Sequence, residues 1–280
     1  MLGSRAVYFL CMVAATIVAS ILLRRRQQRL KISAVQKFGI VIGGLVGATF
    51  AAKLPFVLTA DPNAGVLAAW LSDGKTILWG LTGGYIGVEV AKWSLHVTVS
   101  TGDTFVVPVA ITVAIGRVGC FLYGCCYGVA TNQTWGFRFP IAPDAGAILR
   151  HPTQLYELLF HLSFAAIAAA ALSQPSDINW LRRLRGNWMP VYLIAYSTYR
   201  FTSELWRPEE RDSIGLTFYQ WSSIAIGFSF SLLLVARAVC QQRQPFCAIK
   251  AATARPPEQL TNENQLAMKA KPTVRDFENS

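Results

Sequence analysis

The sequence has little charge, and acidic residues are especially scarce. Only 15% of its 280 residues are charged, and 26 Lys and Arg outnumber 15 Asp and Glu. Hydrophobic residues make up 53% of the chain, which is far more apolar than a soluble domain needs and suits a lipid bilayer as the solvent. The composition therefore excludes an ordinary soluble domain and predicts a protein embedded in a membrane.

The net charge of +11 does not indicate a nucleic-acid-binding protein, because of where the basic residues lie. They avoid the long apolar runs and collect in the short segments between them. Basic residues in such places orient transmembrane helices and leave no basic face for a polyanion. The sequence also lacks a visible internal repeat, which disfavours a transporter built from two related halves.

Long apolar runs dominate the segment 1–240, which we expect to form one all-α domain. A helix needs roughly 20 residues to cross about 30 Å of hydrocarbon. Runs of that length predict a polytopic protein with about seven transmembrane helices, at 6–23, 38–58, 76–95, 104–123, 153–172, 188–206 and 214–236. The segment 241–280 is polar and contains proline, which predicts a disordered cytoplasmic tail.

Basic clusters predict the orientation of these helices. The first run lacks a small-residue cleavage site and ends in the basic segment 24–31, so it predicts a retained helix whose basic end faces the cytoplasm. Alternation then places two later basic segments, 182–185 and 237–250, on the same side. The acidic or mixed segments 61–73 and 209–212 fall on the other side. We therefore expect the N-terminus outside and the C-terminus in the cytoplasm.

Ionisable side chains within the predicted helices are candidate functional groups, because an unpaired charge costs several kcal/mol there. Five positions qualify: Glu89, Arg117, Glu157, Arg200 and Glu204. The expected topology brings all of these except Glu89 to the outer membrane face. This convergence disfavours a channel or carrier, in which polar groups would line a path through the bilayer.

The four converging residues have two interpretations. In the structural one, the two glutamates neutralise the two arginines, and Glu204 lies four residues after Arg200 on one helix face. In the functional one, the arginines bind the phosphodiester of a phospholipid, since guanidinium presents paired donors to phosphate oxygens and keeps its charge when partly desolvated. Both interpretations stay open.

Two further polar pairs follow from helical spacing. Lys92 lies three residues after Glu89, and this pair indicates a structural contact. His161 lies four residues after Glu157 and could move a proton with it, although a hydrogen-bonded interior histidine is the favoured interpretation.

Glycines and cysteines crowd the segment 116–128, GRVGCFLYGCCYG, around Arg117. Its three cysteines could form a disulfide, bind a soft metal, react as thiols or fill space as small hydrophobes, and the first and last interpretations are favoured. Only His151 offers a further ligand nearby, and the C-x4-C-C spacing lacks the pairs of a structural zinc site, so we predict no metal. Another glycine stripe, at 80–87, could accommodate a neighbouring helix or an acyl chain.

Three motifs resemble those of the prolipoprotein diacylglyceryl transferase family. The segment 116–128 is similar to the family signature G-R-x-G-N-F-x-N-x-E-x-x-G, and 150–157, RHPTQLYE, is close to R-H-P-S-Q-L-Y-E. The segment 196–207 is similar to Y-x-x-x-R-F-x-x-E-x-x-R and is followed by a Gly-Leu-Thr segment and Gln220. Tyr8 is similar to a family tyrosine in the first helix, and the resemblance covers roughly Tyr8 to Val235.

The resemblance implies a seven-helix enzyme of the bacterial cytoplasmic (inner) membrane, which acts in lipoprotein biosynthesis. Such an enzyme moves diacylglyceryl from phosphatidylglycerol to the cysteine thiol of a lipobox, without a cofactor or nucleic acid. The catalytic residues it implies here are Arg117, Glu157, Tyr196, Arg200 and Cys125. The substrate-binding residues it implies are Gly119, Cys120, Gly128, His151, Gln154, Tyr156, Glu204 and Arg207.

The chain also departs from the family pattern at residues that could handle protons. Cys120 and Cys125 stand where the signature has asparagine and glutamate, and Thr82 stands where the family has the histidine of H-G-G-L. Glu157 is the favoured acceptor of the thiol proton, and a covalent lipid carrier at Cys125 or Cys126 is an alternative. The departures leave open a divergent paralogue with another acceptor, or a lipid-binding membrane protein without catalysis.

Overall fold

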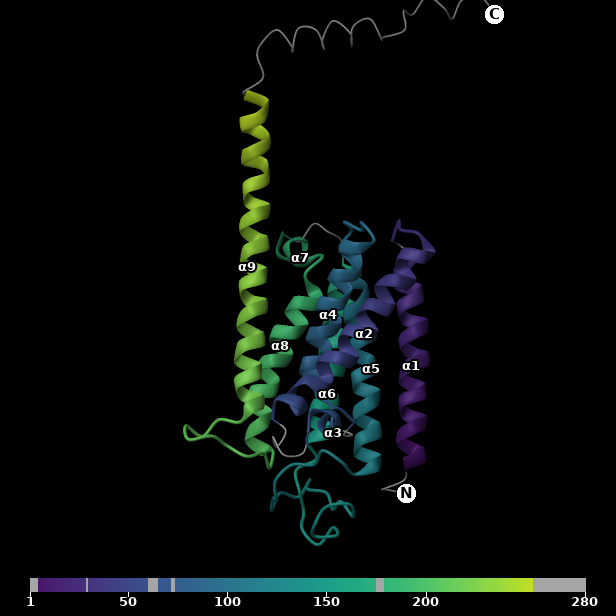
Figure 1. Ribbon diagram of the computed structural model, residues 1–280, viewed down its shortest axis with the longest axis vertical. Coiled ribbons are helices and arrows are strands. Elements are labelled where there is room, and N and C mark those ends of the chain that lie inside the picture. The colour runs from purple at the N-terminus through teal and green to yellow at the C-terminus, as the bar shows by residue number, and fades with distance from the viewer. Residues whose placement is uncertain (1–4, 29, 60–64, 72–73, 175–178, 254–280) are drawn as a thin grey trace, which may run out of the picture. The chain divides into compact units, whose positions relative to one another are not determined.

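The computed structural model of the protein describes residues 5–28, 30–59, 65–71, 74–174 and 179–253 (Figure 1). Regular structure in these residues is helical apart from two isolated bridges, which pair Arg150 with Ala130 and with Phe137. The all-α class is therefore confirmed for the described residues. The helices are α1 (Arg5–Gln27), α2 (Ala34–Leu58), α3 (Val66–Leu71), α4 (Ile77–Ser94), α5 (Gly102–Tyr123), α6 (Thr153–Ser173), α7 (Asn179–Leu184), α8 (Trp188–Ser203), the 3-10 helix η1 (Glu204–Trp206) and α9 (Phe218–Thr253).

Five of the described helices are long and apolar enough to cross a membrane. They are α1, α2, α5, α6 and the part of α9 over Phe218–Cys240. The runs predicted at 76–95 and 188–206 form α4 and α8, which have only 18 and 16 residues. A 16-residue helix rises about 24 Å, less than the roughly 30 Å of a hydrocarbon core. Length and composition thus confirm five of the seven expected spans.

The chain divides into two compact units, Met1–Leu233 and Leu234–Ser280. α9 begins in the first unit and ends at Thr253 in the second, so it overlaps the start of the segment predicted as a disordered tail. Residues 254–280, together with Asp61 and Asp73, lie outside the described residues. The disorder of the tail therefore stays a prediction.

Glycines let α4 pack against α2 at backbone distance. A Cβ atom added to Gly87 would lie 2.1 Å from the carbonyl oxygen of Gly43, and one added to Gly83 would lie 2.4 Å from that of Gly47. Small residues permit this close approach in membranes, where van der Waals contact drives helix association. All four glycines of the 80–87 stripe have α2 atoms as neighbours, so the stripe serves helix packing.

One hydrogen-bonded contact aligns the first turns of α5 and α8. Asp103 in the first turn of α5 accepts hydrogen bonds from the backbone N–H groups of Gly186 at 2.6 Å and Trp188 at 3.2 Å. These bonds satisfy donors that a helix leaves unpaired at its N-terminus. α5 and α8 therefore begin at the same end of the first unit, and their last turns meet the first turn of α6 at the other end.

Adding one methyl group to α4 should destabilise the protein where α4 touches α2 most closely, but not at the next residue. In Gly83→Ala the new methyl would lie 2.2 Å from Ala51 Cβ, so we expect a loss of about 1–3 kcal/mol in stability from overpacking. In Gly84→Ala, one residue away, the methyl meets Ala48 Cβ at an ordinary 3.4 Å. Thermal unfolding in detergent should show a lowered Tm for the first variant only, and equal Tm values would contradict this packing.

Candidate active site

A buried carboxylate lies at the centre of the candidate site. Glu157, on the second turn of α6, has 0% of its surface exposed. Its Oε1 accepts a hydrogen bond from Arg117 Nη2 of α5 at 2.7 Å and another from the Tyr196 hydroxyl of α8. Its Oε2 accepts one from Arg207 Nη2 at 3.2 Å. A buried charge is tolerated only when it is paired and hydrogen-bonded, so these four residues depend on one another.

A second buried ion pair begins at Arg200, one turn after Tyr196 on α8. Arg200 Nη2 donates to Glu204 Oε2 at 2.7 Å, as their spacing of four residues predicted. Glu204 is buried in η1, which continues α8 and leads to Arg207. The predicted convergence of Arg117, Glu157, Arg200 and Glu204 at one end of the bundle is confirmed by these contacts.

The cluster carries more positive than negative charge. Three guanidinium groups, those of Arg117, Arg200 and Arg207, face the two carboxylates of Glu157 and Glu204. Among the described residues, no acceptor meets Arg117 Nε, Arg200 Nη1 or Arg207 Nε, although all three atoms are buried. A buried donor without an acceptor costs about 1–3 kcal/mol. The arrangement is therefore suited to an additional anion.

His161 is an interior histidine held by a tyrosine. Its Nδ1 lies 2.8 Å from the Tyr192 hydroxyl, and its Nε2 lies 3.7 Å from Glu157 Oε1. This arrangement confirms the favoured interpretation of a hydrogen-bonded interior histidine. Sequence reasoning missed Tyr192, although it begins a stripe of four-residue steps on α8 that continues through 196, 200 and 204.

Glu89 and Lys92 form the contact that their spacing predicted. Lys92 Nζ lies 3.1 Å from Glu89 Oε2 on the last turns of α4, and the Glu89 side chain is 38% exposed. Glu89 therefore remains in contact with its surroundings, whereas Glu157 is fully buried.

The cysteine-rich segment folds back over the start of α6. α5 ends at Tyr123 and is followed by Gly124, whose φ of 90° reverses the chain, and Cys126 also has a positive φ of 61°. Gln154 Nε2 donates to the Cys125 carbonyl at 2.5 Å, and Thr153 Oγ1 donates to the Cys126 carbonyl at 2.7 Å. The first turn of the helix that carries Glu157 therefore holds this segment in place.

The sulfur atoms of Cys120, Cys125 and Cys126 lie within 4.8 Å of one another. All three residues are free thiols in this structure, so the disulfide that the sequence allowed is not formed. Cys120 and Cys125 are half-buried, whereas Cys126 is exposed.

The two family glycines predicted to bind substrate lie in tight contacts. A Cβ atom on Gly119 would lie 2.9 Å from Cys11 Cβ of α1, and one on Gly128 would lie 2.5 Å from the Trp206 carbonyl oxygen. Their small size lets α1 and η1 approach the site. Tyr8, one turn before Cys11, packs against Tyr123 with ring centroids 5.9 Å apart.

His151 and Tyr156 form a separate pair at the N-terminal end of α6. His151 Nδ1 lies 3.1 Å from the Tyr156 hydroxyl, which also accepts a hydrogen bond from Trp135 Nε1 at 3.0 Å. The structure thus links these two predicted substrate-binding residues to each other and to the loop before the helix.

An aspartate organises the loop between α5 and α6. Asp144 accepts hydrogen bonds from the backbone N–H of Ile148 at 2.8 Å and from Arg150 Nη2 at 2.9 Å. The Ile148 N–H and, after it, the Arg150 guanidinium lower the pKa of Asp144 below its ordinary value. Arg150 also lies over the Tyr127 ring, 5.1 Å from its centroid, and so connects both ends of the loop.

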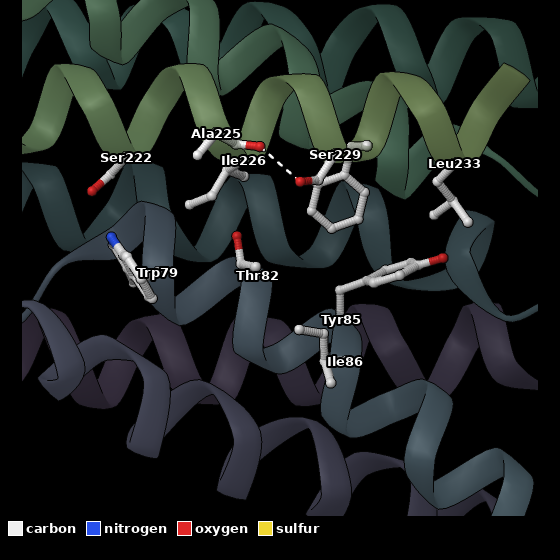
Figure 2. Close-up of a pocket in the computed structure, with 10 residues that line it drawn as sticks. Trp79, Thr82, Tyr85, Ile86, Ser222, Ala225, Ile226, Ser229 and Leu233 are labelled. Atoms are coloured by element: carbon white, nitrogen blue, oxygen red, sulfur yellow. Dashed lines mark hydrogen bonds between the residues drawn. The ribbon is translucent and has the colours of Figure 1, made fainter.

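An open groove of about 440 Å³ lies between α4 and the first turns of α9 (Figure 2). It is lined by Trp79, Thr82, Tyr85, Ile86, Ser222, Ala225, Ile226, Ser229, Phe230 and Leu233. Thr82 donates its hydroxyl to the Leu78 carbonyl at 2.9 Å and faces α9. Ile226 and Phe230 pack in one cluster with Tyr196, which also donates a hydrogen bond to Glu157 and so connects the lining of the groove with the buried carboxylate.

These features define a helical membrane protein with a buried, arginine-rich site near one end and an apolar groove beside it. Residues 4–239 match the family described as prolipoprotein diacylglyceryl transferase. The chain belongs to that family of transferases.

Several relatives carry the name phosphatidylglycerol–prolipoprotein diacylglyceryl transferase. The one from Chlorobaculum tepidum is 30% identical over 215 residues, which cover 72% of this chain and 68% of the relative. The one from Clostridium tetani is 29% identical over 213 residues, covering 73% and 82% respectively. The one from Coxiella burnetii is 28% identical over 224 residues, covering 76% and 80%. No solved structure matches the chain significantly.

Removal of the central charge should destabilise the protein far more than removal of the exposed one. Glu157→Gln leaves Arg117 and Arg207 buried without a counter-ion, which we expect to cost about 3–5 kcal/mol. Glu89→Gln makes the same change at a partly exposed ion pair, where the loss should stay below about 1 kcal/mol. Thermal unfolding of both variants in detergent measures the difference, and equal losses would show that Glu157 does not hold the cluster together.

Proposed function

We propose that this chain is a phosphatidylglycerol–prolipoprotein diacylglyceryl transferase, which moves diacylglyceryl from phosphatidylglycerol to the cysteine thiol of a lipobox. Membership of the family supports the proposal, and so do relatives of that name over most of the chain. The observation that carries it is the excess of three guanidinium groups over two carboxylates, with one buried N–H donor on each guanidinium group that meets no acceptor among the described residues. A phosphodiester supplies both the negative charge and the oxygen acceptors that these donors need.

In the reaction, the arginines stabilise the leaving group. The acceptor sulfur forms a bond to the glyceryl carbon, the bond from that carbon to the phosphate oxygen breaks, and glycerol phosphate leaves with the electron pair. The leaving phosphate gains negative charge in the transition state, and donors already in place stabilise that charge without reorganisation. Arg117, Arg200 and Arg207 have this role, and Tyr196 fixes the carboxylate that orients two of them.

Glu157 positions the arginines before the phosphate binds. Both of its oxygens accept from guanidinium groups, so they are engaged in the free protein. Once phosphate oxygens take these N–H groups, the carboxylate becomes available to accept the thiol proton. Glu204 positions Arg200 in the same way, because it accepts from the guanidinium group until phosphate oxygens replace it.

The remaining predicted residues shape the substrate site. Gln154 donates a hydrogen bond to the Cys125 carbonyl and so fixes the cysteine-rich segment. The contact between His151 and Tyr156 fixes the chain at the N-terminal end of α6. Gly119 and Gly128 let the signature segment approach α1 and η1, and Cys120 follows Gly119 on the last turn of α5. The apolar groove beside Tyr196 accommodates an acyl chain of the lipid, because its lining offers mostly hydrocarbon surface (Figure 2).

A divergent paralogue with another acceptor, or a lipid-binding protein without catalysis, is the alternative. Thr82 and Cys125 favour it, since they stand where the family pattern has a histidine and a glutamate. Both alternatives retain the arginines and differ from the proposal only in whether a lipobox thiol receives the lipid.

Transfer of label from lipid to peptide tests the proposal. With radiolabelled phosphatidylglycerol and a lipobox peptide, the wild-type protein should label the peptide thiol. Arg117→Lys should slow this transfer about 100-fold, because a single ammonium cannot replace paired donors to both Glu157 and a phosphate. The control Arg138→Lys alters an exposed loop arginine that bonds the carbonyls of Gly146 and Ala147, and it should keep the wild-type rate. Absence of transfer by the wild type would favour the alternative.

We also propose seven membrane spans in the bacterial cytoplasmic membrane, with the N-terminus outside and the C-terminus in the cytoplasm. α4 and α8 are the two spans beyond the five that length and composition support. Both pack along longer helices, α4 against α2 and α8 against α5, and η1 extends α8. The arginines of α7 then lie in the cytoplasm with the basic end of α1.

Labelling of introduced cysteines tests this topology. In a background that lacks the native cysteines, Asn132→Cys and Gln174→Cys each place one thiol at an exposed position, in the loops before and after α6. A membrane-impermeant maleimide should label the first in intact cells and the second only after permeabilisation. Labelling with the opposite preference would reverse the topology, and labelling of both in intact cells would remove α6 as a span.

A further inference from the structure

Three sulfur atoms gather where α5 ends. They belong to Cys120 on the last turn of α5 and to Cys125 and Cys126 after it, and they lie within 4.8 Å of one another. Reversal of the chain at Gly124 brings them together, and the first turn of α6 fixes the Cys125 and Cys126 carbonyls. The group is therefore built into the fold at the junction of two helices.

The sulfur separations fit a metal ion better than a disulfide between neighbours. Zinc–sulfur distances of about 2.3 Å place tetrahedral ligand sulfurs about 3.8 Å apart. Cys125 Sγ and Cys126 Sγ lie 3.7 Å apart, and the other separations need to close by about 1 Å at most. A disulfide between adjacent cysteines is unfavourable, because neighbouring Cα atoms lie about 3.8 Å apart and disulfides prefer roughly 4.4 to 6.8 Å.

The surroundings suit three thiolates and leave one coordination position open. Three thiolates around Zn²⁺ carry one net negative charge, and Arg117 lies three residues before Cys120 on α5, so a positive charge is close to the site. Among the described residues the group holds three sulfur ligands without a histidine or carboxylate. Cys126 is exposed, so a ligand from outside can reach the fourth position.

We propose that Cys120, Cys125 and Cys126 bind one Zn²⁺ ion whose open fourth position takes the thiol of the acceptor substrate. A zinc site with three protein ligands and one open position is the arrangement of catalytic zinc, and a coordinating thiol loses its proton. The role of the fourth position rests on the proposed transferase function. The binding of zinc by the three cysteines does not depend on it.

In the transfer step, zinc acts as a Lewis acid on the acceptor thiol. The acceptor thiol loses its proton to Glu157 when it binds the metal, after the lipid phosphate has taken the arginine N–H groups from that carboxylate. Its sulfur then forms the bond to the glyceryl carbon, the carbon–oxygen bond to the phosphate breaks, and glycerol phosphate leaves with the electron pair. The product is a neutral thioether, which is a weaker zinc ligand than a thiolate and therefore dissociates.

Metal content of the purified protein tests the site itself. Protein prepared with a reductant, loaded with Zn²⁺ and desalted should hold about one zinc ion per chain, as a set of three thiolate ligands predicts. Cys125→Ser and Cys126→Ser should each lower zinc affinity at least about tenfold. Cys240→Ser removes an exposed cysteine of α9 and should keep full zinc content. The Tm of each variant shows whether it is folded.

Cobalt gives a readout independent of activity. Co²⁺ bound to the wild-type protein should show the thiolate charge-transfer absorption and tetrahedral visible bands, and both should disappear in the triple serine variant. Equal zinc content in the wild type and a folded triple variant would overturn the site. A Cys120–Cys125 disulfide in protein isolated without reductant, together with failure of the reduced protein to bind zinc, would also overturn it.

The pH dependence of transfer tests the role of the fourth position. Without zinc, the acceptor thiol must ionise near its free pKa of about 8.5, so transfer by chelated protein should require higher pH than transfer by the loaded protein. An unchanged rate and pH profile after zinc removal would overturn the catalytic role while the transferase function stands. Zinc-loaded protein that transfers lipid to no thiol would overturn the transferase function, and the metal content would still decide the site.

Discussion

Burial of the Glu157 carboxylate is the constraint on which the rest of the site depends. A carboxylate with no exposed surface is stable only if donors surround it, and here Arg117, Arg207 and Tyr196 meet its two oxygens. These donors come from α5, from α8 and from the segment after η1. One ion-pair network therefore joins α5, α6 and the end of α8 with η1, which are far apart in the sequence. Loss of Glu157 leaves Arg117 and Arg207 without their shared counter-ion.

The same network explains why the site is suited to an anionic lipid. Its arginines outnumber its carboxylates, and the surplus charge is shielded from water by the surrounding helices. A mobile ion could balance this charge, but only a ligand with several oxygens can also satisfy the three buried N–H groups. Tyr196 connects this polar site to the apolar groove, because it bonds Glu157 and packs with Ile226 and Phe230. A phosphodiester with acyl chains matches both surfaces.

Much of this arrangement could be predicted from spacing along single helices. The apolar runs located the helices, and the four-residue step from Arg200 to Glu204 and the three-residue step from Glu89 to Lys92 each gave a contact that the structure contains. Alternation of the helices brought Arg117 and Glu157 to one end. Such predictions succeed because helical geometry alone decides which side chains of one helix are neighbours.

Contacts that depend on how the chain turns could not be predicted in this way. Arg207 reaches Glu157 because η1 tightens the chain after α8, and the length of the membrane spans says nothing about that turn. The C-x4-C-C spacing did not resemble a zinc site, yet the left-handed conformation of Gly124 folds the three sulfurs together. Alternation of hydrophobic runs also did not show that α4 and α8 fall short in length or composition.

The position of the lipid phosphate tests the central claim most directly. A structure of the protein with bound phosphatidylglycerol should place phosphate oxygens within hydrogen-bond distance of Arg117 and of Arg200 or Arg207, with the acyl chains towards the groove beside Tyr196. A phosphate bound away from all three guanidinium groups, with the Glu157 ion pairs unchanged, would contradict the account and leave the buried arginines a purely structural role.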